Sequence, residues 1–123
     1  MKECIIVFLG GGIGSILRYL ISTFATGKNI QGFPTATFIC NLAGCLLIGM
    51  IYSLTIKFGW SAGTRLFLTT GLCGGFTTFS TFSYESLQLY KNGMVTTATI
   101  YVALSIGIGL LMVYIGQLLC KSI

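Results

Sequence analysis

The chain has 123 residues, of which 54% are hydrophobic and only 7% are charged. A soluble domain normally carries roughly a quarter charged residues, so this composition excludes a water-soluble globular protein and indicates a membrane protein. The sequence has no histidine and only two acids, Glu3 and Glu85, so the usual hydrolytic and metal-site constellations cannot be assembled and an enzyme is not expected. The net charge of +5 comes from basic residues scattered singly, which favours lipid headgroup anchoring over nucleic-acid binding.

Four hydrophobic stretches are long enough to cross a bilayer, since a spanning helix needs about 20 mostly apolar residues. They run from Ile5 to about Phe24, from Thr35 to about Ile56, from Leu66 to about Tyr90 and from Val95 to about Leu119. Short connectors with turn or boundary residues separate them, at 26–29, 57–61 and 91–93. The sequence therefore predicts an all-α membrane protein, with residues 1–123 forming a single domain of four transmembrane helices.

The basic residues at the ends of these stretches show little asymmetry between the two sides of the membrane. Four spans would place Lys2, Lys57, Arg65 and Lys121 on one side, and Lys28 and Lys91 on the other. Such a small difference predicts orientation only weakly. Our hypothesis is that the chain inserts in both orientations and that the two forms pair as an antiparallel, dual-topology homodimer.

The first stretch combines small residues with one arginine. Gly10 and Gly14 form a small-xxx-small pair, which lets transmembrane helices approach closely. Arg18 lies about two-thirds of the way along the stretch. Its long side chain could snorkel to the interface, or it could face inward as a fixed positive charge that satisfies exposed carbonyl groups. Position alone leaves both alternatives open.

Two sets of residues follow helical i, i+4 spacing, which puts the members of each set on one helix face. They are Thr37, Asn41 and Cys45 in the second stretch, and Tyr101, Ser105 and Gly109 in the fourth. Single polar residues in membrane helices usually form interhelical hydrogen bonds, each worth about 0.6 kcal/mol. Together with an interrupted third stretch, the two tracks favour a polar pathway.

The third stretch contains the most informative segment, Gly71–Phe82, in which glycines and hydroxyl residues are crowded at membrane depth. We expect a helix break there, and irregular backbone within a bilayer normally lines a cavity or a pathway. Phe79 and Phe82 follow at i, i+3 spacing and share a face. Their ring edges can attract an anion weakly, and Ser80 and Thr81 place hydroxyl donors beside them.

Three motifs in this chain resemble those of the Fluc (CrcB-type) fluoride channel family: Gly10–Tyr19, Asn41–Gly44 and Gly71–Phe82. The resemblance covers nearly the whole chain, and the third motif is highly specific. It implies a dual-topology antiparallel homodimer with two fluoride pores and a central, structurally bound sodium ion. The chain would then be a fluoride-selective channel of the bacterial cell membrane that exports fluoride passively and lowers its toxicity in the cytoplasm.

The resemblance also implies roles for individual residues. The predicted pore lining joins the residues that match the family's pore positions with the polar track on the second stretch. It comprises Phe79, Phe82, Asn41, Ser80, Thr81, Tyr101, Ser105, Thr37 and Arg18, the last as a vestibule arginine. The backbone carbonyls of Gly74 and Thr77 match those that hold sodium at the dimer axis. Gly109 departs from the pattern, because some relatives have serine there.

From the residues alone, only a small anion pathway with neutral donors is supported, and fluoride comes from the resemblance. A small multidrug-type transporter would share the four-span layout and the dual topology, but proton coupling would need a carboxylate inside the first span, and none is present. A purely structural four-helix subunit would explain the glycines, but it leaves the cluster from Gly74 to Phe82 without a purpose.

Overall fold

The computed structural model describes residues 1–25 and 32–121, which are almost entirely helical and contain no strand within those ranges. Three long helices dominate: α1 (Lys2–Ala25), α2 (Thr35–Phe58) and α6 (Val95–Lys121). Each is long and apolar enough to cross a membrane. The prediction of a helical membrane protein is therefore confirmed, and these helices match the first, second and fourth predicted stretches. The predicted connector Thr26–Asn29 lies outside the described residues.

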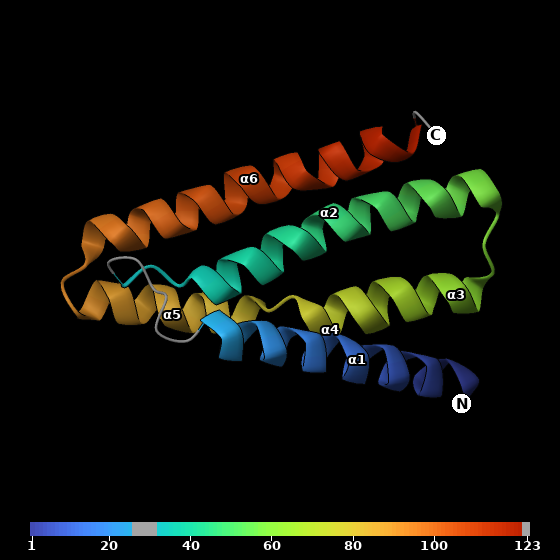
Figure 1. Cartoon of the computed structure of the whole chain (residues 1–123), viewed down its shortest axis with the longest axis horizontal. Helices are drawn as coiled ribbons and strands as arrows, with labels where there is room; N and C mark the ends of the chain where they lie inside the picture. The colour runs from blue at the N-terminus through green and yellow to red at the C-terminus, as the bar shows by residue number, and fades with distance from the viewer. Residues whose placement is uncertain (26–31, 122–123) are drawn as a thin grey trace.

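The segment between α2 and α6 is a series of shorter elements laid nearly end to end (Figure 1). They are α3 (Ala62–Leu66), the π-helix η2 (Phe67–Cys73), α4 (Gly74–Phe76) and α5 (Phe79–Lys91). Between α4 and α5, Thr77 and Thr78 have extended backbone, with φ of −85° and −150°. The π-helix was not predicted, and such wide turns are frequent at functional sites.

Both ends of this segment carry local signals that fix where the chain turns. Gly59 follows α2 with a φ of 60°, a left-handed conformation that glycine adopts at little cost. The hydroxyl of Ser61 then accepts a hydrogen bond from the amide of Thr64 at 3.1 Å and caps α3. At the other end, Gly93 has a φ of 78° between α5 and α6. The segment therefore runs from one end of the molecule to the other.

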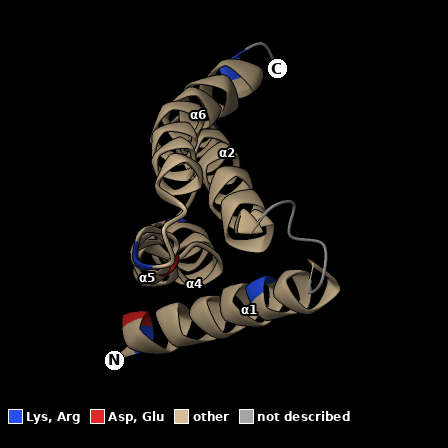
Figure 2. Ribbon diagram, turned by 90° about the vertical axis from the view of Figure 1, so that its left-hand side faces the viewer, with Lys and Arg blue, Asp and Glu red and all other residues tan. Residues whose placement is uncertain are grey.

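The helices form two closely packed groups, with α2 beside α6 and α1 beside η2 and α4 (Figures 1 and 2). Glycines make the second group possible. A Cβ atom on Gly14 would clash with the carbonyl oxygen of Leu72, and one on Gly75 would clash with the backbone of Gly11. The close packing predicted for the first stretch is confirmed, and its partner is the interrupted segment.

Little of the molecule is a conventional core. The main cluster of buried side chains consists of Leu89, Ala98 and Tyr101, with partly buried phenylalanines around it. In α1, only Gly10 and Gly14 are buried, while large apolar side chains such as Phe8 and Phe24 are exposed. Apolar side chains on the outside are expected of helices whose solvent is lipid rather than water.

Candidate functional site

The backbone at the interruption is held by the side chain of Asn41 on α2. Its Nδ2 donates to the carbonyl of Thr78 at 3.1 Å, and its Oδ1 accepts from the amide of Thr78 at 2.8 Å. A single amide side chain thereby satisfies both backbone groups of one extended residue. Backbone groups that are shielded from water and left unpaired are costly, so Asn41 is a main support of the interruption.

The Thr78 side chain begins the next helix. Its hydroxyl oxygen accepts from the amide of Thr81 at 3.2 Å and donates to the Thr81 hydroxyl at 3.0 Å, while Ser80 Oγ lies 3.3 Å away. This is the arrangement of a helix N-cap. It explains why hydroxyl residues are crowded at the start of α5.

These two interactions change what is available to the carbonyl groups of Gly74 and Thr77. In an uninterrupted helix, Gly74 O would accept from the amide of Thr78, and Thr77 O from the amide of Thr81. Both amides are instead used by side chains, of Asn41 and Thr78 respectively. The two carbonyl groups predicted to hold a cation are thus among those that lose their helical donors at this point.

A third carbonyl group near the interruption, that of Gly75, is served by α1. It accepts from Arg18 Nε at 3.1 Å and from Ser15 Oγ at 3.4 Å. Arg18 is half-buried and therefore reaches inward to the end of α4 instead of snorkelling to the membrane surface. The sequence left two directions open for the Arg18 side chain, and in the structure it points inward.

A groove of about 310 Å³ runs along the interruption on the side of α2. Its lining includes Asn41, Cys45, Gly74, Thr77 and Phe79. Gly74 is exposed, and so is 79% of Phe79. The exposed groups at this groove include backbone that the neighbouring helices do not cover.

The two phenylalanines lie together but in different surroundings. Their ring centroids are 5.9 Å apart. Phe82 packs against the fully buried ring of Tyr101, with centroids 5.1 Å apart, while Phe79 projects from the surface. The predicted pair is therefore adjacent, with one ring in the packed interior and the other available to something outside the chain.

The structure gives Glu85 a position that the sequence did not reveal. Thr37 Oγ1 donates to Glu85 Oε1 at 2.8 Å, and the Tyr101 hydroxyl donates to Oε2 at 2.9 Å. The sequence identifies Glu85 as one of two acids and names no partner for it. Its presence within an apolar stretch was the available signal, because acids in membrane segments usually mark a pathway or a relay.

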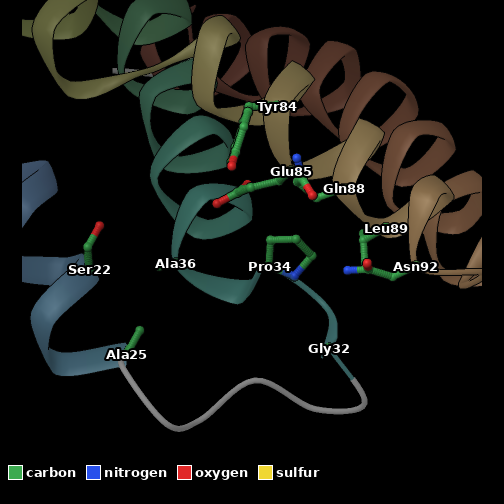
Figure 3. Close-up of a pocket in the computed structure, with 10 residues that line it drawn as sticks. All are labelled: Ser22, Ala25, Gly32, Pro34, Ala36, Tyr84, Glu85, Gln88, Leu89 and Asn92. Carbon is green, nitrogen blue, oxygen red and sulfur yellow. The ribbon is translucent and has the colours of Figure 1, made fainter.

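A cavity of about 340 Å³ leads to Glu85 from the end of the molecule where α5 finishes (Figure 3). Glu85 extends from α5 toward α2, with Gln88 beside it and Asn92 nearer the opening. Ser22 on α1 forms the opposite wall. Polar groups thus line this cavity as far as Glu85, whose carboxylate accepts from the buried donors Thr37 and Tyr101.

The remaining predicted residue on α6 is Ser105. Its hydroxyl oxygen is buried and has no hydrogen-bond partner among the described residues. It lies one turn from Tyr101, on the face predicted from the i, i+4 spacing. Gly109 is buried one turn further, and a Cβ there would lie 3.6 Å from Cys45 Sγ, an ordinary contact distance.

These features define a helical multi-pass membrane protein with polar groups gathered around an interruption in one helical segment. The family model of the CrcB-like proteins, described as "CrcB-like protein, Camphor Resistance (CrcB)", matches residues 5–117. The chain belongs to this family.

Curated relatives share the name "Fluoride-specific ion channel FluC". One from Phocaeicola vulgatus is 48% identical over 94% of this chain and 96% of its own length. One from Flavobacterium psychrophilum is 44% identical over the full length of both chains. One from Clostridium perfringens is 49% identical over 95% of this chain and 92% of its own. This is a family of ion channels and not of enzymes.

Proposed function

We propose that this protein is a fluoride-specific channel of the bacterial cell membrane that lets fluoride leave the cytoplasm passively. The observation that carries the proposal is the full-length similarity to relatives named fluoride-specific channels, combined with donors converging inside the protein. Fluoride holds its water tightly, so a selective path must replace that water with closely spaced hydrogen-bond donors. Neutral hydroxyl and amide groups can do so without trapping the ion.

Residues 1–123 would form one domain with four membrane crossings, the third made by the interrupted segment from α3 to α5. The N- and C-termini lie at the same end of the molecule, as an even number of crossings requires (Figure 1). Thr77 and Thr78 would then lie within the bilayer. Such backbone is tolerated only where protein covers it or where it borders a water-filled space.

An antiparallel homodimer would supply that cover. The groove with Gly74, Thr77 and Phe79 exposes polar backbone and an aromatic ring in the middle of an otherwise apolar surface. Facing lipid, these polar groups would be poorly solvated. A second copy in the opposite orientation could place its own interruption against this one. The small difference in basic residues between the two sides of the membrane is compatible with both orientations.

A sodium ion between the two copies would satisfy the carbonyl groups of Gly74 and Thr77. The fit to this chain rests on the diversion of their usual amide donors to Asn41 and Thr78. Hard cations prefer oxygen ligands, and two copies would provide four carbonyl oxygens. No carboxylate lines the groove in the described part of the chain, and neutral ligands suit a singly charged ion.

The fluoride path would follow the pore lining predicted from the sequence, with Glu85 added. Thr37 and Tyr101 direct their hydroxyl groups at the two carboxylate oxygens of Glu85, at hydrogen-bonding distance. An anion that took the place of one of these oxygens would meet the same donors. The unpaired hydroxyl of Ser105 offers a further donor one helical turn away.

Fluoride efflux from proteoliposomes tests the proposal. Purified protein is reconstituted with internal potassium fluoride, and external fluoride is followed with an electrode after valinomycin is added to carry potassium. We expect fast fluoride release and no chloride release under the same conditions. Drug-dependent proton movement without fluoride release would instead indicate the small multidrug-type transporter, and absence of both would indicate a structural subunit. Dimer stability in sodium, compared with N-methylglucamine, tests the cation site separately.

A further inference from the structure

The largest cavity among those described lies at the end of the molecule where the chain begins, and it shares Thr69 with the lining of the groove beside the interruption. It measures about 700 Å³ and lies between the start of α1, the end of α2 and the elements α3 and η2. Lys2, Glu3 and Arg65 are at its charged edge, and Ile6, Tyr52 and Leu66 form apolar wall. None of these residues belongs to the proposed fluoride path.

The charged edge of the cavity carries an excess of positive charge. Lys2 and Arg65 are exposed, and neither forms an ion pair with an acid in the described ranges. Glu3, the one acid in the lining, pairs with the amino group of Met1 at 3.6 Å. Figure 2 shows an acidic and a basic residue next to each other at the beginning of α1. An anionic group would therefore find two free cationic side chains here.

An apolar groove continues from this cavity along the outside of α1. It measures about 440 Å³ and is lined by Cys4, Val7 and Phe8, together with Glu3 and Leu66, which it shares with the cavity. Phe8 is 76% exposed. A cationic cavity and an apolar groove thus share a border, at the level where α1 and α3 begin.

We propose that this cavity and groove form a binding site for an anionic phospholipid. The phosphate would lie between Lys2 and Arg65, and an acyl chain would follow Val7, Phe8 and Leu66 down the side of α1. Basic residues at the ends of membrane helices lie at headgroup level, where anionic lipids are attracted to them. The chemistry requires both a negative headgroup and a long apolar tail, which a free phosphate lacks. The site does not depend on the ion conducted.

Trp60 allows a direct test, because it is the only tryptophan and comes two residues before α3. The whole protein is reconstituted with phosphatidylcholine containing a small, fixed fraction of either brominated phosphatidylglycerol or brominated phosphatidylcholine. Bromine quenches nearby tryptophan fluorescence. We expect the brominated phosphatidylglycerol to quench several-fold more than the zwitterionic lipid does at equal fraction. Equal quenching by the two lipids would overturn the proposal.

Matched variants assign the effect to the cavity. The double variant Lys2→Gln with Arg65→Gln should lose the preference for phosphatidylglycerol. The variant Lys91→Gln with Lys121→Gln removes the same charge outside the cavity and should keep it. Equal loss in both variants would mean a general charge effect and would refute a site. Cys4, which lines the groove, provides a second test. If a short bis-maleimide links two copies through Cys4, a second copy of the chain covers the groove, and the lipid site is refuted.

Discussion

Asn41 and Thr78, 37 residues apart in the chain, are joined by two hydrogen bonds, so that a side chain of α2 replaces the helical partners of an extended residue in the next segment. This pairing frees the carbonyl of Gly74, because the amide that would have served it is occupied. The same asparagine lines the groove beside the interruption. The same two hydrogen bonds of Asn41 therefore both hold the interruption in place and leave the carbonyl of Gly74 without its helical donor.

Replacing Asn41 with Asp should impair both stability and conduction. Aspartate can still accept from the Thr78 amide but cannot donate to its carbonyl, and it adds a negative charge. Leaving a buried partner unsatisfied costs about 1–3 kcal/mol. We expect a lower melting temperature in detergent and a loss of fluoride efflux. Ser53→Ala is the matched control, since Ser53 is also on α2 and makes a single 3.4 Å bond to Gln117 O. Unchanged efflux in Asn41→Asp would contradict the assigned role.

Arg18→Met tests the contact between α1 and the end of α4. Methionine is about as long as arginine up to Nε but has no N–H group, so it cannot donate to Gly75 O, which lies 3.1 Å from Arg18 Nε in the native protein. A hydrogen bond from a charged group is worth about 1.5–3 kcal/mol, so efflux should fall about tenfold or more if this contact fixes the interruption. Electrode traces on reconstituted variants measure the change. Lys91→Met, which removes one exposed positive charge at the end of α5, should conduct normally; equal losses in both variants would point to net charge instead.

Much of the fold was predictable because bilayer thickness sets helix length, so three apolar runs of about 20 residues identify three helices directly. The site was less accessible. Arg18 lies 57 positions from its acceptor Gly75, and Glu85 lies 48 positions from Thr37. The spacing of residues within one helix cannot predict contacts between residues so far apart in the sequence. The direction of the arginine depends on Gly14 letting α1 approach closely enough for its side chain to reach the carbonyl, which only the packed structure reveals.

Gly75→Ala should prevent α1 from packing against the interrupted segment. The added methyl group would collide with the backbone of Gly11, and backbone cannot yield as a flexible side chain can. Overpacking of this kind costs about 3 kcal/mol or more when nothing can move aside. We expect loss of the monodisperse peak in size-exclusion chromatography and no efflux. Gly107→Ala provides the control, because nothing lies within 4 Å of a Cβ at that position. Normal behaviour of Gly75→Ala would mean that α1 is not held as described.

Tyr101→Phe removes one of the two donors directed at Glu85 while keeping the buried ring. The aromatic contacts with Phe82 and Phe33 should persist, so the melting temperature should fall only by the contribution of the lost hydrogen bond to Glu85. Efflux should fall about tenfold, since a hydrogen bond to a charged group contributes about 1.5–3 kcal/mol. The control is Tyr114→Phe, on the same helix but 58% exposed. A large drop in stability with normal conduction at low temperature would assign Tyr101 to packing alone.

Phe79→Ile and Phe82→Ile should separate the two rings of the predicted pore. Phe79 is 79% exposed, so its loss removes little packing within one chain, whereas Phe82 lies 5.1 Å from the buried ring of Tyr101. Large-to-small changes at packed aromatic positions are costly, and those at exposed positions are small. We therefore expect Phe82→Ile to lower both the melting temperature and efflux, but Phe79→Ile to lower efflux with a near-native melting temperature. Tyr84→Ile, 65% exposed on the same helix, controls for loss of an exposed aromatic ring. If Phe79→Ile conducts like the native protein, the exposed ring faces lipid and not a pathway shared with a second copy.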